Sequence, residues 1–367
     1  MASQNPGAAS RGLSPDVTRA EQSDAEGAHG DAIDHLAAGA RKNDVEAMTR
    51  LGKRLLVGDR APCLPKEGAR FIADASARGG AEAAGALAVL YAVGASQRHG
   101  VGDALESLIL AAERGWPHAQ AQLEVLAESP SGVDARAAAP EPQSAPRSSL
   151  DWRRLGQRID LAAWRTAPSS TDLSTSPLVR TYPEFLGESV CRWFIDKARG
   201  RLSRALVYEA VRREVMARPT RTNTAAAFNL LETDLVCVLA QQRMAACLGV
   251  AFRHFEPVTV LHYDEGEEIT DHFDFVDPNL PTYEEEIAQR GQRVVTFLAY
   301  LNDDYGGGET AFPRLGISHK GRRGEGLFFV NALPDGGADV RTLHAGKTPV
   351  RGEKWIISQF VRNRPVL

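Results

Sequence analysis

The sequence lacks long apolar runs, closely spaced cysteines and a large excess of charge of either sign. No stretch of its 367 residues is long and apolar enough to cross a bilayer. Residues 1–31 lack the basic-then-apolar order of a secretory signal, so we expect a cytoplasmic protein that has no membrane partner. The four cysteines form no CxxC pair, which argues against a zinc knuckle and against a disulfide framework.

Charge and composition narrow the class further. The chain has 43 Lys and Arg against 47 Asp and Glu, whereas a protein that binds phosphate backbones normally has a basic excess. We therefore expect no nucleic-acid partner. With 43% hydrophobic residues and more length than one ordinary domain needs, the chain is expected to fold as two globular domains joined by a linker.

The first part of the chain divides into a polar tail and a helical repeat. Residues 1–36 carry few large apolar side chains, so a disordered tail is expected there. Over 37–128 an Ala- and Leu-rich helical pattern recurs at intervals of 36 residues, as at Ala47, Ala83 and Ala119. Small residues at such positions let helices approach closely. The segment resembles Sel1-like repeats, a branch of the tetratricopeptide group, and an ordinary Ala-rich helical bundle is the alternative.

A linker and a second domain follow. Residues 129–150 are rich in Pro, Ser and Ala without apolar periodicity, which is typical of an inter-domain linker. Within 151–367 helical patterns come first, and β-branched and aromatic runs follow beyond Phe255: PVTVLHY, RVVTFLAYL, GLFFVNA and KWIISQFV. Helices followed by antiparallel strands predict an α+β domain whose strands close into a jelly roll.

The segment DHFDF places a histidine and an aspartate two residues apart. On an extended strand His272 and Asp274 project from the same face, so both can bind one metal ion. With a second histidine they would form the facial set of two imidazoles and one carboxylate that leaves positions open on iron(II). His344, in TLHAGKTPV, is the candidate. An isolated HxD is weak evidence for a metal site, because a solvated histidine beside a turn-forming aspartate explains the pattern equally well.

A lysine ten residues after the second histidine (354 − 344) strengthens this hypothesis. Lys354 stands at the start of the next expected strand, where it would face the same pocket. A basic side chain is what the distal carboxylate of 2-oxoglutarate requires once its keto-acid end has chelated the metal. Because a lone lysine is usually solvated, the inference rests on the combination of Lys354 with the three metal-ligand candidates.

Over about 179–362 the motifs resemble the catalytic domain of the prolyl 4-hydroxylase α-subunit. They are PVTVLHYDEGEEITDHFDF, RVVTFLAYLNDDYGGGETAFP, RRGEGLFFVN and LHAGKTPVRGEKWIISQFVR, in the family's order. The resemblance implies a double-stranded β-helix, iron(II) as the metal, 2-oxoglutarate and dioxygen as cosubstrates, and ascorbate as an auxiliary ligand. It matches His272, Asp274 and His344 to the metal ligands and Lys354 to the 2-oxoglutarate anchor.

The resemblance also assigns positions around the site. It places the hydroxyl groups of Tyr263 and Thr296 beside the cosubstrate, although both residues are good strand formers and simple sheet packing explains them as well. Arg362 occupies the family's position near the chain end that helps substrate turnover. The segment 276–292, VDPNLPTYEEEIAQRGQ, falls in the substrate-facing region and is acidic.

Three functions remain open on these residues. The favoured one is an iron(II) and 2-oxoglutarate dependent dioxygenase that hydroxylates an unactivated C–H, in a prolyl residue of a protein or peptide recruited by the repeats. The second is a hydroxylase of a free amino acid or small metabolite. The third is a non-catalytic repeat adaptor, against which the complete ligand set argues. A cupin-like zinc hydrolase would need neither Lys354 nor the shared strand motifs.

Overall fold

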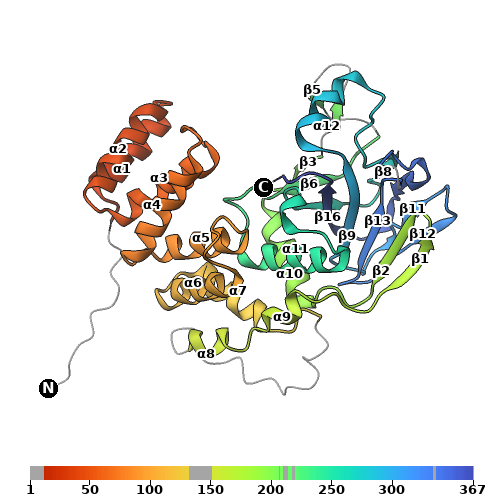
Figure 1. The fold of residues 1–367 in the computed structure, drawn as a ribbon, viewed down its shortest axis with the longest axis horizontal. Coiled ribbons are helices and arrows are strands. Elements are labelled where there is room, and N and C mark those ends of the chain that lie inside the picture. The colour runs from red at the N-terminus through yellow and green to blue at the C-terminus, as the bar shows by residue number, and fades with distance from the viewer. Residues whose placement is uncertain are drawn as a thin grey trace. The chain divides into compact units, whose positions relative to one another are not determined.

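The computed structural model describes residues 12–131, 151–205, 220–333 and 336–366, together with the backbone of 207–209 and 214–216. The chain forms two compact units, 1–120 and 121–367, and each is described by itself (Figure 1). Apart from its first three residues, the expected linker 129–150 lies outside the described residues. The expected domain limits therefore stay predictions.

The first unit is built of helices, the last of which continues past residue 120. Their bounds are α1 (Pro15–Ala25), α2 (His29–Arg41), α3 (Val45–Val57), α4 (Pro65–Ala77), α5 (Ala81–Ala92), α6 (Val101–Glu113) and α7 (Pro117–Leu126). Helices begin at 29, 65 and 101 and again at 45, 81 and 117, so an interval of 36 residues governs every helix from α2 to α7. No helix in the described ranges combines the length and apolar character needed to span a membrane.

The repeat register decides what these helices bury. Ala47, Ala83 and Ala119 are the third residues of α3, α5 and α7, and all three are fully buried. Where α3 meets α4, a Cβ atom on Gly68 would lie 2.7 Å from the carbonyl oxygen of Gly52, so neither helix could carry a side chain at this contact. The small residues thus serve close helix packing, as the resemblance to Sel1-like repeats predicted.

The turns between the helices repeat as well. Asn43, Gly79 and Gly115 precede α3, α5 and α7 and have φ angles of 62°, 99° and 86°. Glycine and asparagine tolerate this left-handed conformation better than other residues, which is why they end helices at a turn. The backbone therefore follows the same interval as the buried alanines.

The expected disordered tail is wrong for residues 15–36. They form α1 and part of α2, and Val17, Ala32 and Leu36 are buried in one core with residues of α3. Alanine favours the helix, and one or two large apolar side chains per helix are enough where helices pack closely. Counting only large apolar side chains therefore underestimated the surface that this segment buries. Residues 1–11 lie outside the described part of the chain.

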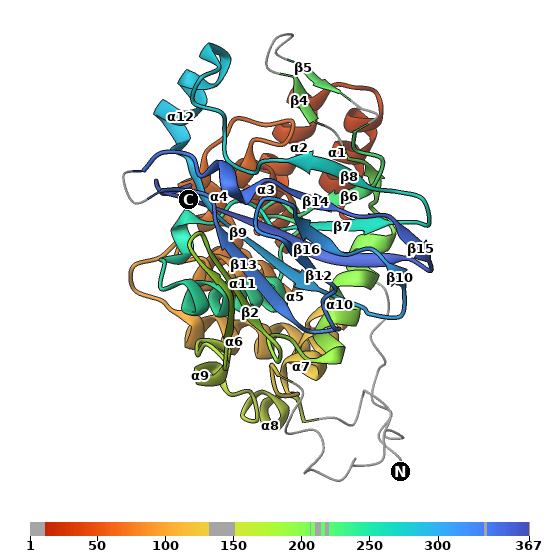
Figure 2. The ribbon, with the colours of Figure 1, turned by 90° about the vertical axis from the view of Figure 1, so that its right-hand side faces the viewer.

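The second unit is an α+β domain built on two antiparallel sheets. The larger sheet has the strand order β1-β2-β13-β9-β16-β7-β6-β3, and the smaller has the order β12-β11-β14-β8. Figure 2 shows the larger sheet in this order from β2 to β6. The strands are β1 (Thr171–Thr175), β2 (Leu178–Tyr182), β3 (Ser203–Arg204), β6 (Thr224–Ala227), β7 (Thr259–Tyr263), β8 (Ile269–His272), β9 (Arg293–Tyr300), β11 (Thr310–Phe312), β12 (Ile317–His319), β13 (Gly326–Val330), β14 (His344–Gly346) and β16 (Lys354–Arg362). Two small pairs are β4 (Val207–Glu209) with β5 (Glu214–Met216), and β10 (Gly306–Gly307) with β15 (Pro349–Arg351).

Helices complete this unit. They are α8 (Trp152–Gly156), α9 (Leu161–Trp164), α10 (Glu188–Arg199), α11 (Leu235–Leu248) and α12 (Glu284–Arg290), with short 3-10 turns at Phe252–His254, Pro281–Tyr283 and Val340–Thr342. Helix α11 is buried along most of its length, and Gln241 Nε2 donates to Gln359 Oε1 of β16 at 2.7 Å. Asp234 caps its start by accepting from Cys237 N at 2.9 Å.

The four strand-like runs expected beyond Phe255 are β7, β9, β13 and β16, which stand together in the larger sheet. The predicted α+β fold with an antiparallel jelly roll is confirmed.

The second unit begins before the expected linker. Gln122 Oε1 accepts from Leu235 N at 2.9 Å, and Ser131 Oγ accepts from Arg243 Nη2 at 2.8 Å. The second unit therefore includes chain that the sequence assigned to the repeats.

Candidate metal centre

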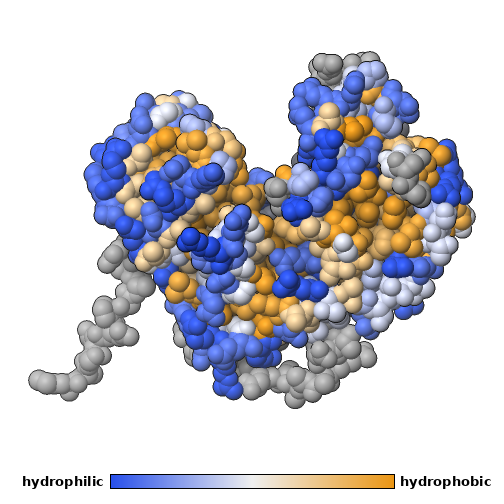
Figure 3. Space-filling view, in the orientation of Figure 1, coloured by the Kyte–Doolittle hydropathy of each residue, from blue (hydrophilic) through white to orange (hydrophobic). Residues whose placement is uncertain are grey.

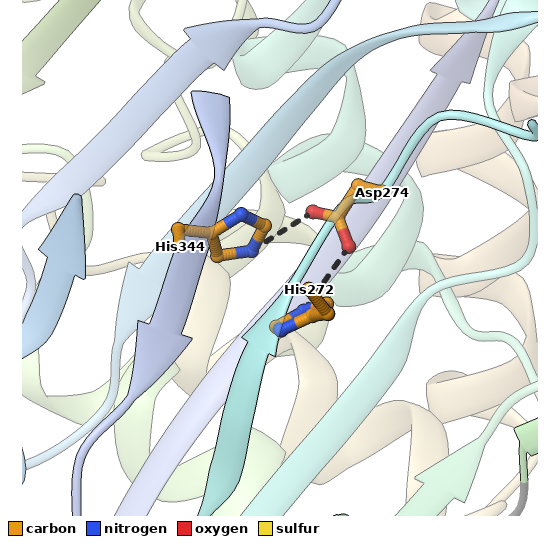
Figure 4. A group of neighbouring side chains, drawn as sticks. All are labelled: His272, Asp274 and His344. Carbon is orange, nitrogen blue, oxygen red and sulfur yellow. Dashed lines mark ion pairs between the residues drawn. The ribbon is translucent and has the colours of Figure 1, made fainter. Parts of the chain in front are cut away.

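Strands β8 and β14 bring the three metal-ligand candidates together. His272 ends β8 and is the register partner of His344, which begins β14, and Asp274 follows two residues after β8 ends. His272 Nε2 lies 3.5 Å from Asp274 Oδ1, and His344 Nε2 lies 3.4 Å from Asp274 Oδ2 (Figure 4). One atom from each of the three side chains lies within 4.8 Å of the others.

Backbone carbonyls orient both imidazoles. His272 Nδ1 lies 2.8 Å from the carbonyl oxygen of Thr270, and His344 Nδ1 lies 3.0 Å from that of Thr342. Because a carbonyl oxygen only accepts, each Nδ1 must carry a proton and donate, which leaves a lone pair on Nε2 of the neutral ring. These Nε2 atoms are the ones that face Asp274, so the arrangement offers two nitrogen donors and one carboxylate to a single ion.

Burial and proximity set the charges of these groups. Burial, together with the neighbouring His344, lowers the pKa of His272. Burial opposes ionisation of Asp274, yet His344 and His272 hold the pKa of this carboxyl well below its usual range. A neutral imidazole and an ionised carboxylate are the forms that bind a divalent cation, so the donor set suits iron(II).

Thr296 supports the carboxylate. Its Oγ1 donates to Asp274 Oδ2 at 2.8 Å, and it accepts in turn from Asn331 Nδ2 at 2.9 Å. Both Thr296 and Asn331 are fully buried. The sequence placed the Thr296 hydroxyl beside the cosubstrate, whereas the structure places it on a metal-ligand candidate. Sequence reasoning missed Asn331, although the residue ends the motif RRGEGLFFVN.

We expect Thr296→Val to weaken iron binding by about 10- to 100-fold, because groups that orient a metal ligand have effects of this size. The substitution removes the hydroxyl while keeping a β-branched side chain of similar volume. Thr296→Ser, which retains the hydroxyl, is the matched control. Equilibrium dialysis of iron(II) against the wild type and both variants measures the effect. Equal iron affinity in Thr296→Val and the wild type would show that the hydrogen bond to Asp274 has no influence on the metal.

Lys354 is buried at the start of β16. Its side chain has no exposed surface, and its Nζ donates to the Gly308 carbonyl oxygen at 2.7 Å. Among the residues that the structure describes, no carboxylate lies within ion-pairing distance of this Nζ. Burial lowers the pKa of Lys354 to about 7, and Glu309 opposes that shift. A buried ammonium without an anionic partner is costly, so this site favours an anion.

The GGGET segment has a direct part in holding Lys354. Gly308 has φ 71°, and a Cβ atom there would lie 2.9 Å from the Tyr305 ring. The left-handed backbone and the close ring both require glycine, and this conformation directs the Gly308 carbonyl to the lysine. Thr310, in the same segment, is buried and accepts from Tyr300 Oη at 2.9 Å. The sequence showed GGGET only as part of the motif RVVTFLAYLNDDYGGGETAFP, so the place of Thr310 in the pocket lining was missed.

A single pocket joins these groups. Its lining includes the three metal-ligand candidates together with Lys354, Tyr263 and Thr310. Tyr263 is the register partner of Lys354, and its ring centroid lies 5.3 Å from Lys354 Nζ. Burial raises the pKa of Tyr263 to about 12, so the phenol keeps its proton and can donate a hydrogen bond. The structure thus brings Tyr263 to the pocket, as the sequence predicted, while Thr296 lies behind Asp274.

A second group of potential metal ligands lies outside this pocket. His262, Asp264 and Glu267 also place one donor atom each within 4.8 Å of one another. Both ring nitrogens of His262 are already engaged, however: Nδ1 lies 3.0 Å from Thr224 Oγ1, and Nε2 lies 3.0 Å from Glu353 Oε2. The three residues in the pocket are therefore the better metal centre.

The sequence of the second unit matches known proteins. Residues 258–362 match the model of the 2OG-Fe(II) oxygenase superfamily. Probable prolyl 4-hydroxylase 3 of Arabidopsis thaliana is 30% identical over 209 residues, which cover 52% of this chain and 70% of that protein. Probable prolyl 4-hydroxylase 7 of the same plant is 28% identical over 209 residues, which cover 52% of this chain and 64% of that protein. The chain therefore spans about two thirds of the length of these curated relatives.

Two solved structures are each similar to part of the chain. The viral collagen prolyl hydroxylase of Paramecium Bursaria Chlorella virus-1, in its 2OG complex, is 27% identical, and the match covers 50% of this chain and 95% of that one with a TM-score of 0.39. A Sel1 repeat protein from Oxalobacter formigenes is 20% identical, and the match covers 38% of this chain and 53% of that one with a TM-score of 0.26.

Proposed function

Because the chain belongs to the 2OG-Fe(II) oxygenases related to prolyl 4-hydroxylases, we propose that it hydroxylates an unactivated C–H in a prolyl residue of a protein or peptide. In this proposal His272, Asp274 and His344 hold iron(II), and Lys354 anchors 2-oxoglutarate. The observation that carries it is the presence, in one pocket, of the facial donor set and a buried lysine that no described carboxylate neutralises. When bound, iron(II) and 2-oxoglutarate supply the activation of dioxygen that such a hydroxylation requires.

Each residue has a separate task in this proposal. The Lys354 ammonium has three N–H donors, and Gly308 accepts from one of them, so a carboxylate of the cosubstrate can take up the rest. Tyr263 provides a protonated hydroxyl on the neighbouring strand. Thr296 and Asn331 hold the Asp274 carboxylate in one orientation. The protein therefore contributes binding and orientation, and it needs no acid or base of its own.

Apolar side chains make up much of the pocket wall. Leu261, Leu298 and Ile356 line it, and each is less than 10% exposed. Such a wall excludes water from the metal, and it strengthens the pairing between Lys354 and an anion because the local dielectric constant is low. An apolar wall also suits an apolar ring such as that of proline.

Mass spectrometry tests the proposal directly. The chain, loaded with iron(II), is incubated with 2-oxoglutarate and a pool of proline-containing peptides, with the His344→Ala variant as the control. We expect prolyl residues to gain one oxygen atom only with the wild type, together with formation of succinate. Turnover of 2-oxoglutarate that responds to a free amino acid or metabolite, with no peptide modified, would instead establish the small-molecule hydroxylase. Absence of any 2-oxoglutarate turnover would contradict both.

Three finer expectations stay predictions. They are recruitment of the protein substrate by the helical repeats, ascorbate as an auxiliary ligand, and a cytoplasmic compartment. Comparing the hydroxylation of a protein substrate with that of a short peptide cut from it measures what the repeats add. Stimulation of turnover by ascorbate is measured in the same assay.

Binding of 2-oxoglutarate is expected to weaken above about pH 7. Burial lowers the pKa of Lys354 to about 7, so its charged form predominates below this pH and is lost as pH rises through it. The anion needs the charged form, and its binding raises the pKa again, so the apparent affinity should fall by up to about tenfold per pH unit above about 7. Titration calorimetry between about pH 6 and about pH 9 measures this trend.

Lys354→Arg is the matched control for this pH dependence. A guanidinium stays charged over the whole range, so any binding that this variant retains should not weaken between about pH 7 and about pH 9. If the wild type and Lys354→Arg showed the same dependence, the titrating group would not be Lys354.

A further inference from the structure

The acidic segment 276–292 forms part of the pocket wall. It connects Asp274 to β9, carries α12, and lines the pocket with Asp277, Pro278, Leu280, Tyr283 and Glu286. Helix α12 has seven residues, three of them successive glutamates in its first turn. A helix this short does not persist by itself. Contacts with the rest of the unit must therefore hold the segment in place.

One such contact closes the base of the segment. Gln292 Nε2 donates to the Val276 carbonyl oxygen at 2.6 Å, and Gln292 Oε1 accepts from Val276 N at 2.7 Å. The side-chain amide thus satisfies both backbone groups of Val276, as a neighbouring strand would. Gln292 is 7% exposed, and its own backbone pairs with Asn363 just after β16. The two ends of the segment are therefore fastened to each other.

A buried arginine holds the helix. Arg362 Nη2 donates to Glu286 Oε1 of α12 at 2.6 Å, and Nη1 donates to the Gly291 carbonyl oxygen at 2.6 Å. Its Nε donates to Glu256 Oε1 at 2.5 Å, and Glu256 also binds Arg293 through both of its oxygens. Burial opposes ionisation of Glu256, but the two arginines keep the pKa of this carboxyl below its usual range. The Arg362 side chain has no exposed surface, so solvent screens these contacts little.

Strand β16 carries both Arg362, which holds α12, and Lys354, which is proposed to bind 2-oxoglutarate. Its alternate residues Lys354, Ile356, Ser358 and Phe360 line the pocket, and Arg362 is the next in this alternation. Arg362 itself is not part of the lining, because its guanidinium turns to α12. Its contacts with Gly291 and Glu286 therefore connect strand β16 with segment 276–292.

We propose that Arg362 and Gln292 are positioning residues that hold segment 276–292 against the pocket, and that this segment selects which peptide reaches the metal. The inference rests on the proposed function, because the selected molecule is the hydroxylation substrate. Selection requires a wall of fixed shape, since a segment that moves freely accepts many partners. Figure 3 shows both hydrophilic and hydrophobic residues on the face around α12, and no residue of this helix is buried, so its own apolar side chains do little to hold it.

Two variants loosen the segment without touching a metal-ligand candidate. Glu286→Gln removes the charge that Arg362 binds, and Gln292→Ala removes the two hydrogen bonds to the backbone of Val276. Glu284→Gln is the matched control, because Glu284 is an exposed glutamate of the same helix that does not line the pocket. Hydrogen exchange of the full chain, read over 276–291, should become about tenfold faster or more in the first two variants, because Glu286→Gln loses the charge that Arg362 binds and Gln292→Ala loses two buried hydrogen bonds.

The second measurement concerns selection. The wild type and the three variants are given one pool of synthetic peptides that share a central proline and differ in the flanking residues. We expect the preference among peptides to flatten in Glu286→Gln and Gln292→Ala, with a smaller change in the KM for 2-oxoglutarate. Glu284→Gln should keep the wild-type preference.

Three outcomes would overturn the inference. The first is exchange over 276–291 that is the same in Glu286→Gln, Gln292→Ala and Glu284→Gln. The second is exchange that rises equally over 276–291 and over β7 and β16, which would show general destabilisation. The third is faster exchange with an unchanged preference among peptides. If the wild type turns over no 2-oxoglutarate, the proposed function fails, whereas the exchange measurement still decides whether Arg362 and Gln292 hold the segment.

Discussion

Alanine at His272, Asp274 or His344 is expected to abolish turnover and iron binding while the second unit stays folded. Each substitution removes one of the three donors that come together in this group, and the described residues of the group include no fourth to replace it. The strands that carry the two histidines pair through backbone hydrogen bonds that alanine keeps, and Asp274 lies beyond the end of β8. Iron content, succinate formation and circular dichroism of each variant measure the three parts of this expectation.

His262→Ala is the control for the metal assignment. It removes a histidine from the second group of potential ligands, which lies outside the pocket. We expect this variant to keep its iron, although it loses hydrogen bonds to Thr224 and Glu353. Near-wild-type iron content and activity in any of the three alanine variants in the pocket, or loss of iron in a folded His262→Ala, would show that the metal lies elsewhere.

Lys354→Ala is expected to raise the KM for 2-oxoglutarate by two or more orders of magnitude. Leaving one partner of a buried charge pair without the other costs roughly 3–5 kcal/mol. At about 1.4 kcal/mol per factor of ten in affinity, this corresponds to a loss of at least about a hundredfold. Iron binding should survive, because Lys354 is not among the three metal-ligand candidates. A 2-oxoglutarate titration of succinate formation, beside an iron-binding assay, measures both effects.

Lys320 offers a matched control for this experiment. Its Nζ also donates to a backbone carbonyl, that of Tyr305 at 2.5 Å, and also lies over a tyrosine ring, at 5.0 Å from the centroid. It does not line the pocket. Lys320→Ala should therefore leave the KM for 2-oxoglutarate unchanged. If both lysine variants raised this KM equally, the effect would come from general loss of charge or packing.

The sequence predicted those parts of the fold and site that depend on local order. His272 and Asp274, two residues apart, face one site as expected, although β8 ends at His272 and Asp274 lies beyond it, and the buried alanines of the repeats keep one interval. The order of residues along the chain does not show which residue from a distant part of the domain a side chain contacts. Thr296 was expected to point inward and does, but its contact with Asp274 depends on how β9 passes behind the end of β8.

The contact of Arg362 could not be predicted from the sequence either. Its partner Glu286 is 76 residues away and is one of three successive glutamates, so the sequence could not indicate which of them the arginine binds. The prediction of a disordered polar tail failed for a different reason. Composition measures how many large apolar side chains a segment has, whereas closely packed helices bury alanines that this measure leaves out.

The pairing of His344 with His272 makes the metal centre sensitive to strand register. A slip of one residue between β14 and β8 would turn every side chain of β14 to the opposite face, and His344 would leave the site. These strands have only three and four residues, so their own hydrogen bonds resist such a slip weakly. A bound ion stabilises only the pairing that it recognises, by RT ln(1 + [L]/Kd). Bound iron would thus stabilise the pairing of β8 with β14 in the smaller sheet. Its removal should let these two strands separate before the larger sheet unfolds.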